Sequence, residues 1–499
     1  MRAAKHASFF ALAIIITSML GFVREIIVAR TFGASLEMDC FIVAFAIVSF
    51  IGAILSPQTM QTMFMPAYQD ELKRGPTSAS EIINNTGLML LYILGLGTLL
   101  GYLLAPYIVK TLMPGFTDEQ IHLTKHLMRI MMPLVLIYGM ASLGHALCNS
   151  HKQFVLPLSS QTLNNVTLLV LLFLVPIDSV YSLAWYHLYG GMAAGILLFI
   201  TYFKLVPNRR TNPHNRAHIA AFKATWPLLI LAFIDQAAML LPRSFGSLLE
   251  HGDITALNYG FRLITLPVAI IAMAIASVLF PTIINQVRDL PGKSSGAIRM
   301  GTSMLLLCLT PISVLMCIEN VAIVDLFFAS NSFDAEAVRK TASSLRYYAL
   351  GIMGLGYLLF LNRIYCAYRR YWPYVYANLI AFVMLIALSW LLIGPMGHDG
   401  IALAFTLYCY IACIALVIGM RKFSPISLIG LGTLLRIILS TAIASILLWF
   451  WKSESILILG AESAAFFLIY ITILWVTREP ELRTILSHLG ITEAKEATL

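Results

Sequence analysis

The sequence predicts an all-α polytopic membrane protein with about fourteen transmembrane helices. Of its 499 residues, 59% are hydrophobic and only 11% are charged, and its mean hydropathy is +0.84. A soluble protein keeps about a quarter of its residues charged. Apolar stretches of about 20 residues recur along the chain, and this is the length that a helix needs to cross a bilayer.

The predicted spans follow one another with short connections. The first apolar run is not interpreted as a signal peptide, because it is too long, lacks a small-residue cleavage site and continues into a polytopic chain. The seventh and eighth runs are long for one crossing, so their ends are expected to project or tilt. In order, the runs lie near residues 8–30, 39–65, 82–105, 121–147, 153–175, 182–205, 219–249, 255–284, 298–318, 341–366, 373–394, 399–420, 427–450 and 455–476.

The net charge of +9 comes from basic residues in short loops between the apolar runs, a pattern that reflects topology and not a nucleic-acid-binding face. Alternate loops are rich in Lys and Arg, as at Lys73–Arg74, Lys204–Arg216 and Arg288–Arg299. The intervening loops are sparse in basic residues and include the acidic stretch Glu250–Asp253. The positive-inside rule therefore places both termini in the cytoplasm.

The sequence contains little evidence for a catalytic or metal-binding site. It has no Walker A, HExxH or GxSxG motif, and its seven cysteines are scattered through apolar segments without a CxxC pair. We therefore expect a transporter and not an enzyme, with no cofactor. Without an ATPase motif, the energy for transport must come from an ion gradient, the membrane potential or the gradient of the substrate.

Two short stretches indicate an internal repeat. "CNSHKQFVLP" (148–157) and "CAYRRYWP" (366–373) each combine a helix end, a basic turn, an aromatic residue and a proline at a helix start. Their spacing predicts two related six-helix lobes around a central cavity. The predicted domains are 1–205 (spans 1–6), 206–422 (spans 7–12), 423–478 (two additional spans) and 479–499 (a cytoplasmic tail).

Charged residues inside the membrane are candidate functional residues, because leaving a charge in hydrocarbon costs at least about 2.5–3.5 kcal/mol. Arg24 and Glu25 lie in the first span, and Asp39 opens the second. Neighbouring helical residues point about 100° apart, so Arg24 is expected to pair with Asp39 and not with Glu25. An ion pair that fixes helix packing and a gating role are both open for Arg24 and Asp39.

Three arginines in the second half are candidates for binding an anionic head group. Arg243 and Arg262 lie within the seventh and eighth spans, and guanidinium groups offer a bidentate fork to phosphate oxygens. Arg363 lies near the cytoplasmic end of the tenth span, where snorkelling to the interface is the favoured interpretation. Asp235 shares a helix face with Arg243, so it either neutralises Arg243 or coordinates a cation.

A sodium site is a further hypothesis. Asp235 in the seventh span, Asn378 in the eleventh and Thr406 in the twelfth offer oxygen ligands. Na⁺ is accordingly a candidate coupling ion.

Several stretches together resemble the MurJ/MviN lipid II flippase family of the multidrug/oligosaccharidyl-lipid/polysaccharide exporter superfamily. The similarity extends from about residue 8 to 420, in order and at the family's spacing. The stretch at 254–283 is the closest and carries Arg262 at the family's arginine position. The stretches are "LGFVREIIVARTFGASLEMDCFIVAF" (20–45), "MPGFTDE" (113–119), "ASLGHALCNSHKQFVLPLSSQTLNN" (141–165), "ITALNYGFRLITLPVAIIAMAIASVLFPTI" (254–283) and "LNRIYCAYRRYWP" (361–373).

The resemblance implies a fourteen-helix fold in which two lobes enclose a cationic cavity and the last two helices form a lipid-facing groove. It also implies alternating-access flipping of an undecaprenyl-diphosphate-linked glycan, by default lipid II of peptidoglycan synthesis, across the bacterial inner membrane. Arg24 and Asp39 match essential or gate positions of the family. The implied partners are the glycan lipid, the bilayer and the machinery of cell-wall or polysaccharide synthesis.

The sequence departs from the family's pattern at several cavity positions. Thr17-Ser18 stands where the family has a serine-arginine pair, and Gly52 and Ala53 lie in an uncharged stretch that replaces two arginines. Glu25 replaces an aspartate. The alternatives to lipid II are therefore a lipid-linked capsule, exopolysaccharide or O-antigen unit, or a drug or solute carried by a cation-coupled antiporter of the same superfamily.

Overall fold

The computed structural model describes residues 2–175, 177, 179–206, 217–289, 295–368, 370–421, 430–450, 456–477, 479 and 482. Every secondary-structure element in these ranges is a helix, which confirms the predicted all-α class. The chain forms two compact units, Met1–Thr255 and Ala256–Leu499, and each is described by itself.

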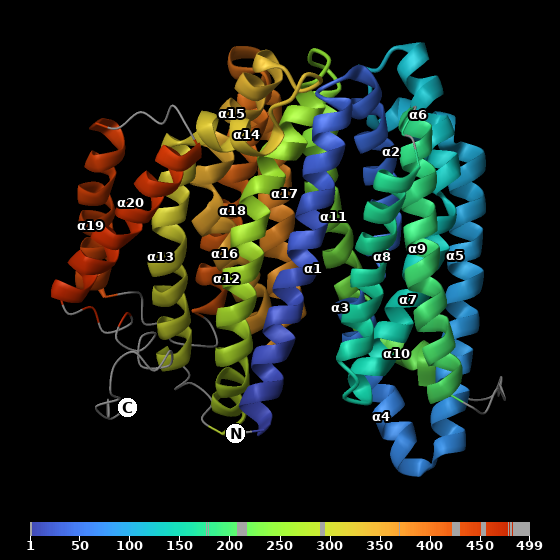
Figure 1. Ribbon diagram of the computed structural model, residues 1–499. Coiled ribbons are helices and arrows are strands. Elements are labelled where there is room, and N and C mark those ends of the chain that lie inside the picture. The colour runs from blue at the N-terminus through green and yellow to red at the C-terminus, as the bar shows by residue number, and fades with distance from the viewer. Residues whose placement is uncertain are drawn as a thin grey trace. The chain divides into compact units, whose positions relative to one another are not determined.

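The first unit contains the helices that Figure 1 draws from blue to green. Its central contacts join α2 to α6 and α7, and α9 to α7 and α8. The helices are α1 (Arg2–Phe32), α2 (Leu36–Ala53), α3 (Pro57–Met63), α4 (Met65–Arg74), α5 (Pro76–Leu112), α6 (Asp118–Met131), α7 (Pro133–Ser150), α8 (Val155–Leu174), α9 (Val180–Leu205), α10 (Ala217–Thr225) and α11 (Pro227–Gly246).

The second unit begins within α12 and extends through the last described helix (Figure 1). Its most extensive contact joins α17 to α18, and α19 packs against α13 and α20. The helices are α12 (Asp253–Asp289), α13 (Ser295–Ile318), α14 (Asn320–Phe328), α15 (Ala335–Leu350), α16 (Ile352–Ala367), α17 (Tyr371–Met396), α18 (His398–Met420), α19 (Leu431–Phe450) and α20 (Ile456–Val476).

Eleven helical segments of the described chain are long and apolar enough to cross a membrane. The pair α15–α16, bent by 50°, brings this number to twelve if it forms one span. The other two predicted spans correspond to α1 and to α19, whose apolar part is the shorter helix Gly432–Ile446. A multi-pass membrane protein is therefore established, whereas the exact number of fourteen spans stays a prediction.

Several predicted runs are broken where the sequence places a proline. The run 39–65 is not one helix, because α2 ends at Ala53 and α3 begins at Pro57. Pro133 opens α7 and Pro227 opens α11, so the runs 121–147 and 219–249 are each divided. Proline lacks an N–H and clashes with the preceding turn, so it is favoured in the first turn of a helix and costly in the interior. It does not always end a helix here, since Pro106, Pro242, Pro311 and Pro395 lie inside described helices.

The two stretches that predicted the repeat form the same local structure. The turn after α7 leads into α8, and the turn after α16 leads into α17. In each case the proline, Pro157 or Pro373, is the third residue of the new helix. The helix that precedes each turn is also in two parts, α6–α7 and α15–α16.

The resemblance of the two segments extends to their beginning. Thr117 caps α6 with a full capping box, and Asp334 caps α15 by accepting from the Ala337 N–H. A buried phenylalanine precedes each cap, Phe116 and Phe333 respectively. The predicted lobe boundaries at residues 205 and 422 stay a prediction, since the two compact units follow contacts and not the repeat.

Candidate functional site

Arg24 and Glu25 form an ion pair on α1. The Arg24 Nη2 lies 2.7 Å from Glu25 Oε1, and the two side chains are only 12% and 15% exposed. Arg24 Nη1 also donates to Asn165 Oδ1 on α8, at 3.3 Å. The expected Arg24–Asp39 pair is therefore wrong in this structure: two long side chains fold toward each other despite their 100° separation around the helix.

The contact between α1 and α8 is polar although both helices are apolar overall. The Asn165 side-chain N–H donates to the Thr17 carbonyl at 3.1 Å, and the Thr17 and Thr162 hydroxyls lie 2.6 Å apart. Gly21 permits this close packing, since a Cβ there would lie 3.3 Å from Asn165 Nδ2. Arg24 is thus held by its neighbour Glu25 and by a polar seam between two membrane helices.

Asp39 is 2% exposed and has a different set of partners. Its carboxylate accepts the Gly252 N–H at 2.6 Å, the Thr255 N–H at 2.8 Å and the Thr255 hydroxyl at 2.6 Å. These N–H groups lie at the start of α12, where a helix leaves its first donors without partners inside the helix. Asp39 therefore caps α12 from α2 by accepting three hydrogen bonds.

Gly252 makes this cap possible. Its φ of +86° suits glycine, and a Cβ would lie 2.7 Å from the Ala34 carbonyl oxygen. The sequence analysis selected Asp39 as a candidate but paired it with Arg24, and it missed Gly252 and Thr255 as the partners of Asp39. The available signal was a glycine directly before the helix start "DIT" (253–255), just ahead of the stretch at 254–283 that resembles the family.

A second contact joins the same part of the chain to the "MPGFTDE" stretch. The Gly115 N–H donates to Ser247 Oγ at 3.3 Å, and the Ser244 hydroxyl donates to the Leu112 carbonyl. A Cβ on Gly115 would lie 2.0 Å from the Ser247 carbonyl oxygen, so only glycine fits. Together with Asp39, this contact fastens the segment between α11 and α12 to α2 and to the end of α5. We call these two contacts the latch.

The remaining candidates in the first unit lie on α11. Asp235 and Arg243 are partly exposed side chains of this helix, and the Arg243 guanidinium donates to the Met239 carbonyl one turn earlier. No ion pair between Asp235 and Arg243 is found in the described chain. The two predicted roles of Asp235 therefore stay open.

The candidates in the second unit lie on four helices. Arg262 on α12 is partly buried, and Arg363 on α16 is exposed, as the snorkelling interpretation requires. Asn378 on α17 is fully buried, and its amide donates to the Tyr374 carbonyl at 3.0 Å. Its Oδ1 has no hydrogen-bond partner in the described chain.

Two of the three predicted sodium ligands offer oxygen atoms that suit a cation. The Thr406 hydroxyl donates to the Tyr347 carbonyl at 2.8 Å, which leaves its oxygen lone pairs for a ligand. Asn378 Oδ1 is a buried oxygen that also lacks a partner, so both donors suit a hard cation. Asp235 belongs to the other unit, and the three-residue site stays a prediction.

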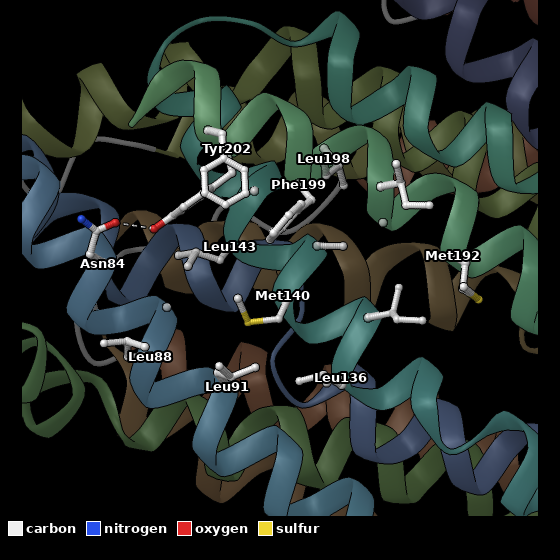
Figure 2. A pocket seen from close by; sticks show the side chains of 17 residues that line it. Asn84, Leu88, Leu91, Leu136, Met140, Leu143, Met192, Leu198, Phe199 and Tyr202 are labelled. Carbon is white, nitrogen blue, oxygen red and sulfur yellow. Dashed lines mark hydrogen bonds between the residues drawn. The ribbon is translucent and has the colours of Figure 1, made fainter. Parts of the chain in front are cut away.

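A cavity of about 520 Å³ lies between α5, α7 and α9 in the first unit (Figure 2). Its walls are apolar side chains such as Leu91, Met140 and Phe199, and none of its lining residues is charged. The Tyr202 hydroxyl donates to Asn84 Oδ1 at 2.7 Å at one end (Figure 2). A cavity of this kind suits hydrocarbon and does not suit a diphosphate, so the charged candidates and not this cavity mark the site.

Most of the chain matches a known family. The family described as "Lipid II flippase MurJ" matches residues 28–469. The chain belongs to the MurJ family. A relative named "Probable lipid II flippase MurJ", from Buchnera aphidicola subsp. Acyrthosiphon pisum, is 25% identical over 450 residues and covers 87% of each chain.

Solved structures show the fold. A structure titled "Lipid II flippase MurJ, inward closed conformation" has a TM-score of 0.82 and 19% identity, over 96% of this chain and 99% of that chain. An inward-facing multidrug resistance MATE transporter of the MOP superfamily has a TM-score of 0.68 and 12% identity, over 83% and 97%. The MurJ assignment confirms the resemblance inferred from the sequence, and it identifies the chain as a transporter.

Proposed function

We propose that this chain flips lipid II, an undecaprenyl-diphosphate-linked glycan, from the inner to the outer leaflet of the bacterial inner membrane by alternating access. The observation that carries the proposal is the match of the MurJ family to residues 28–469. The chain also spans 87% of the Buchnera relative that bears the name of a lipid II flippase. Both termini lie in the cytoplasm in this proposal, and the synthesis machinery supplies and removes the glycan lipid.

Arg24 would bind the diphosphate of the lipid, and the diphosphate would compete with Glu25 for the Arg24 guanidinium. In this structure its guanidinium is neutralised by Glu25, with N and O atoms 2.7 Å apart. A diphosphate diester carries two negative charges, one more than a carboxylate, and accepts a bidentate Arg contact. The arriving diphosphate would displace Glu25 from Arg24, and its departure would restore the pair, so Glu25 would facilitate release.

The latch would control whether the substrate path is open to the outer side of the membrane. Asp39 holds the start of α12 with three hydrogen bonds, and charge-assisted hydrogen bonds contribute about 1.5–3 kcal/mol each. Breaking them would allow the segment between α11 and α12 to leave α2. In this proposal the outward-open state lacks the latch, and the inward-facing state keeps it.

Complementation tests the cargo. The endogenous lipid II flippase is depleted in a bacterial host, and the chain or its Arg24→Ala variant is supplied at matched membrane abundance. We expect the wild type to restore growth and Arg24→Ala to fail. Lys73→Ala is the matched control, because this cation is 78% exposed on α4 and should rescue.

Vesicle reconstitution separates the alternatives. Proteoliposomes are loaded with labelled lipid II or with a labelled undecaprenyl-diphosphate-linked polysaccharide unit, and movement to the other leaflet is measured. Failure of the well-expressed wild type with lipid II, in cells and in vesicles, would contradict the lipid II assignment. Movement of the polysaccharide unit would then support the second cargo.

A further inference from the structure

Glu462 is a buried acid in the second turn of an apolar helix. It lies in α20, within the apolar span Ile458–Val476, and is only 1% exposed. Neither carboxyl oxygen has a hydrogen-bond partner in the described chain. An isolated carboxylate in such surroundings is unstable by several kcal/mol unless it is neutralised. Glu462 therefore needs a positive charge that the described residues do not supply.

A second acid lies close to it. Glu319 is 9% exposed and joins α13 to α14, and α14 packs against α20. Its backbone N–H donates to the Leu315 carbonyl, and its carbonyl accepts the Ile323 N–H, so its backbone is fixed between two helices. Burial, with a smaller effect from the Glu462 carboxyl, raises the pKa of Glu319 above its ordinary value.

The end of α13 adds negative potential at the same place. The last carbonyls of a helix carry the negative end of its dipole. Asn320 Nδ2 satisfies the Cys317 carbonyl at 2.7 Å. Neither Glu319 nor Glu462 forms an ion pair with a described Lys, Arg or His residue. Arg346 on α15 lies near Cys317 in the last turn of α13 but forms no ion pair with either acid in the described chain. Two buried carboxyls and a helix C-terminus thus converge without a described cation paired to them.

We propose that Glu462 and Glu319 together bind one monovalent cation, a proton or a sodium ion, where α20 meets the junction of α13 and α14. This site is separate from the predicted ligands Asp235, Asn378 and Thr406. It does not depend on the identity of the transported lipid. Its occupancy would stabilise the packing of α20, the last described helix, against α14.

Thermal unfolding of the full chain in lipid nanodiscs tests the proposal. The Asp235→Asn background removes the other candidate cation ligand. Sodium chloride replaces choline chloride at constant ionic strength, and pH is varied separately. Because a ligand that binds only the folded state stabilises it by mass action, we expect either sodium or acid to raise the midpoint by about 2–4 °C. Glu462→Gln should abolish that response, because glutamine needs no neutralising charge.

Titration with sodium at fixed pH and titration with acid distinguish the two cations, because only the cation that binds should raise the unfolding midpoint. A sodium response at fixed pH that Glu462→Gln and Glu319→Gln both remove supports a sodium ion. An acid response, with an infrared carbonyl band of a protonated carboxyl that Glu462→Gln removes, supports a proton. Glu336→Gln is the matched control, since Glu336 is 61% exposed on α15 and its variant should respond as the parent does.

The proposal is overturned if the parent responds to neither cation, or if Glu462→Gln responds as the parent does. If Glu462→Gln does not fold, Glu319→Gln supplies the comparison. The titration of the parent protein remains decisive in that case.

Discussion

Arg24 shows how the surroundings of one residue decide its chemistry. A buried ion pair has a large desolvation penalty, and attraction offsets it only when geometry and further hydrogen bonds are good. The 2.7 Å contact to Glu25 and the additional bond to Asn165 provide these for Arg24. The same arrangement keeps a cation available inside the membrane for an anionic head group.

A double-variant series separates the structural and functional roles of Arg24. Arg24→Ala leaves Glu25 buried without its partner, and we expect it to lower the free energy of unfolding by about 3 kcal/mol. Adding Glu25→Gln removes the unpaired charge and should recover most of that loss, as measured by denaturant titration in detergent. Neither Arg24→Ala nor the double variant should restore growth in the complementation assay. Restored growth with the double variant would mean that Arg24 has only a structural role.

Asp39 provides a second test at the same scale. Asp39→Asn loses the negative charge and presents an amide N–H group to backbone donors, so we expect a loss of about 1.5–3 kcal/mol in unfolding free energy. Glu37→Gln is the control, because Glu37 is an exposed acid in the same first turn of α2. Equal stability of the two variants would argue against the latch.

At the scale of helices, starts and breaks follow local rules. Thr117 and Gln120 form a capping box at the start of α6, and proline opens α7 and α11. Ser179 precedes α9 but makes no side-chain cap hydrogen bond. A residue of a capping type therefore does not by itself establish a cap.

This contrast gives a matched pair of variants. Thr117→Ala removes an oxygen that accepts the Gln120 N–H at 3.3 Å, and we expect it to lower the unfolding free energy by about 1 kcal/mol. Ser179→Ala should change it by much less. The comparison is made by thermal unfolding in the same detergent, and a reversed order would contradict the assigned caps.

A Gly252 variant measures how much the latch contributes to stability and to transport. Gly252→Ala places a Cβ 2.7 Å from the Ala34 carbonyl oxygen at a φ of +86°, so we expect a loss of about 1–3 kcal/mol. Gly95→Ala on α5 meets open space and should be neutral or slightly stabilising. Reduced transport with an unchanged midpoint for Gly252→Ala would indicate that the latch matters for the cycle and not for stability.

At the scale of the whole molecule, the alternation of basic loops predicts the topology. None of the seven native cysteines is exposed, so a membrane-impermeant thiol reagent should label the parent weakly. Lys73→Cys should be labelled only after the inner membrane is permeabilised. Glu336→Cys should be labelled once the outer surface of that membrane is accessible. The opposite pattern would reverse the orientation and place both termini outside.

The membrane class, the approximate positions of the spans, the repeated hairpins and the family were all predictable from the order of residues alone. These features depend on apolar length, proline positions and loop charge, which are local properties of the chain. The sequence also selected Arg24 and Asp39, because charges in apolar helices are rare and costly.

The groups that these charged side chains contact became known only from the packing of the helices. Sequence spacing suggested Arg24 with Asp39, but Arg24 lies against Glu25 and Asn165, and Asp39 caps α12. The bend between α15 and α16 and the isolation of Glu462 were equally hidden. Partners far apart in the chain are set by helix packing and side-chain conformation, and helical periodicity specifies only the direction in which each side chain leaves its own helix.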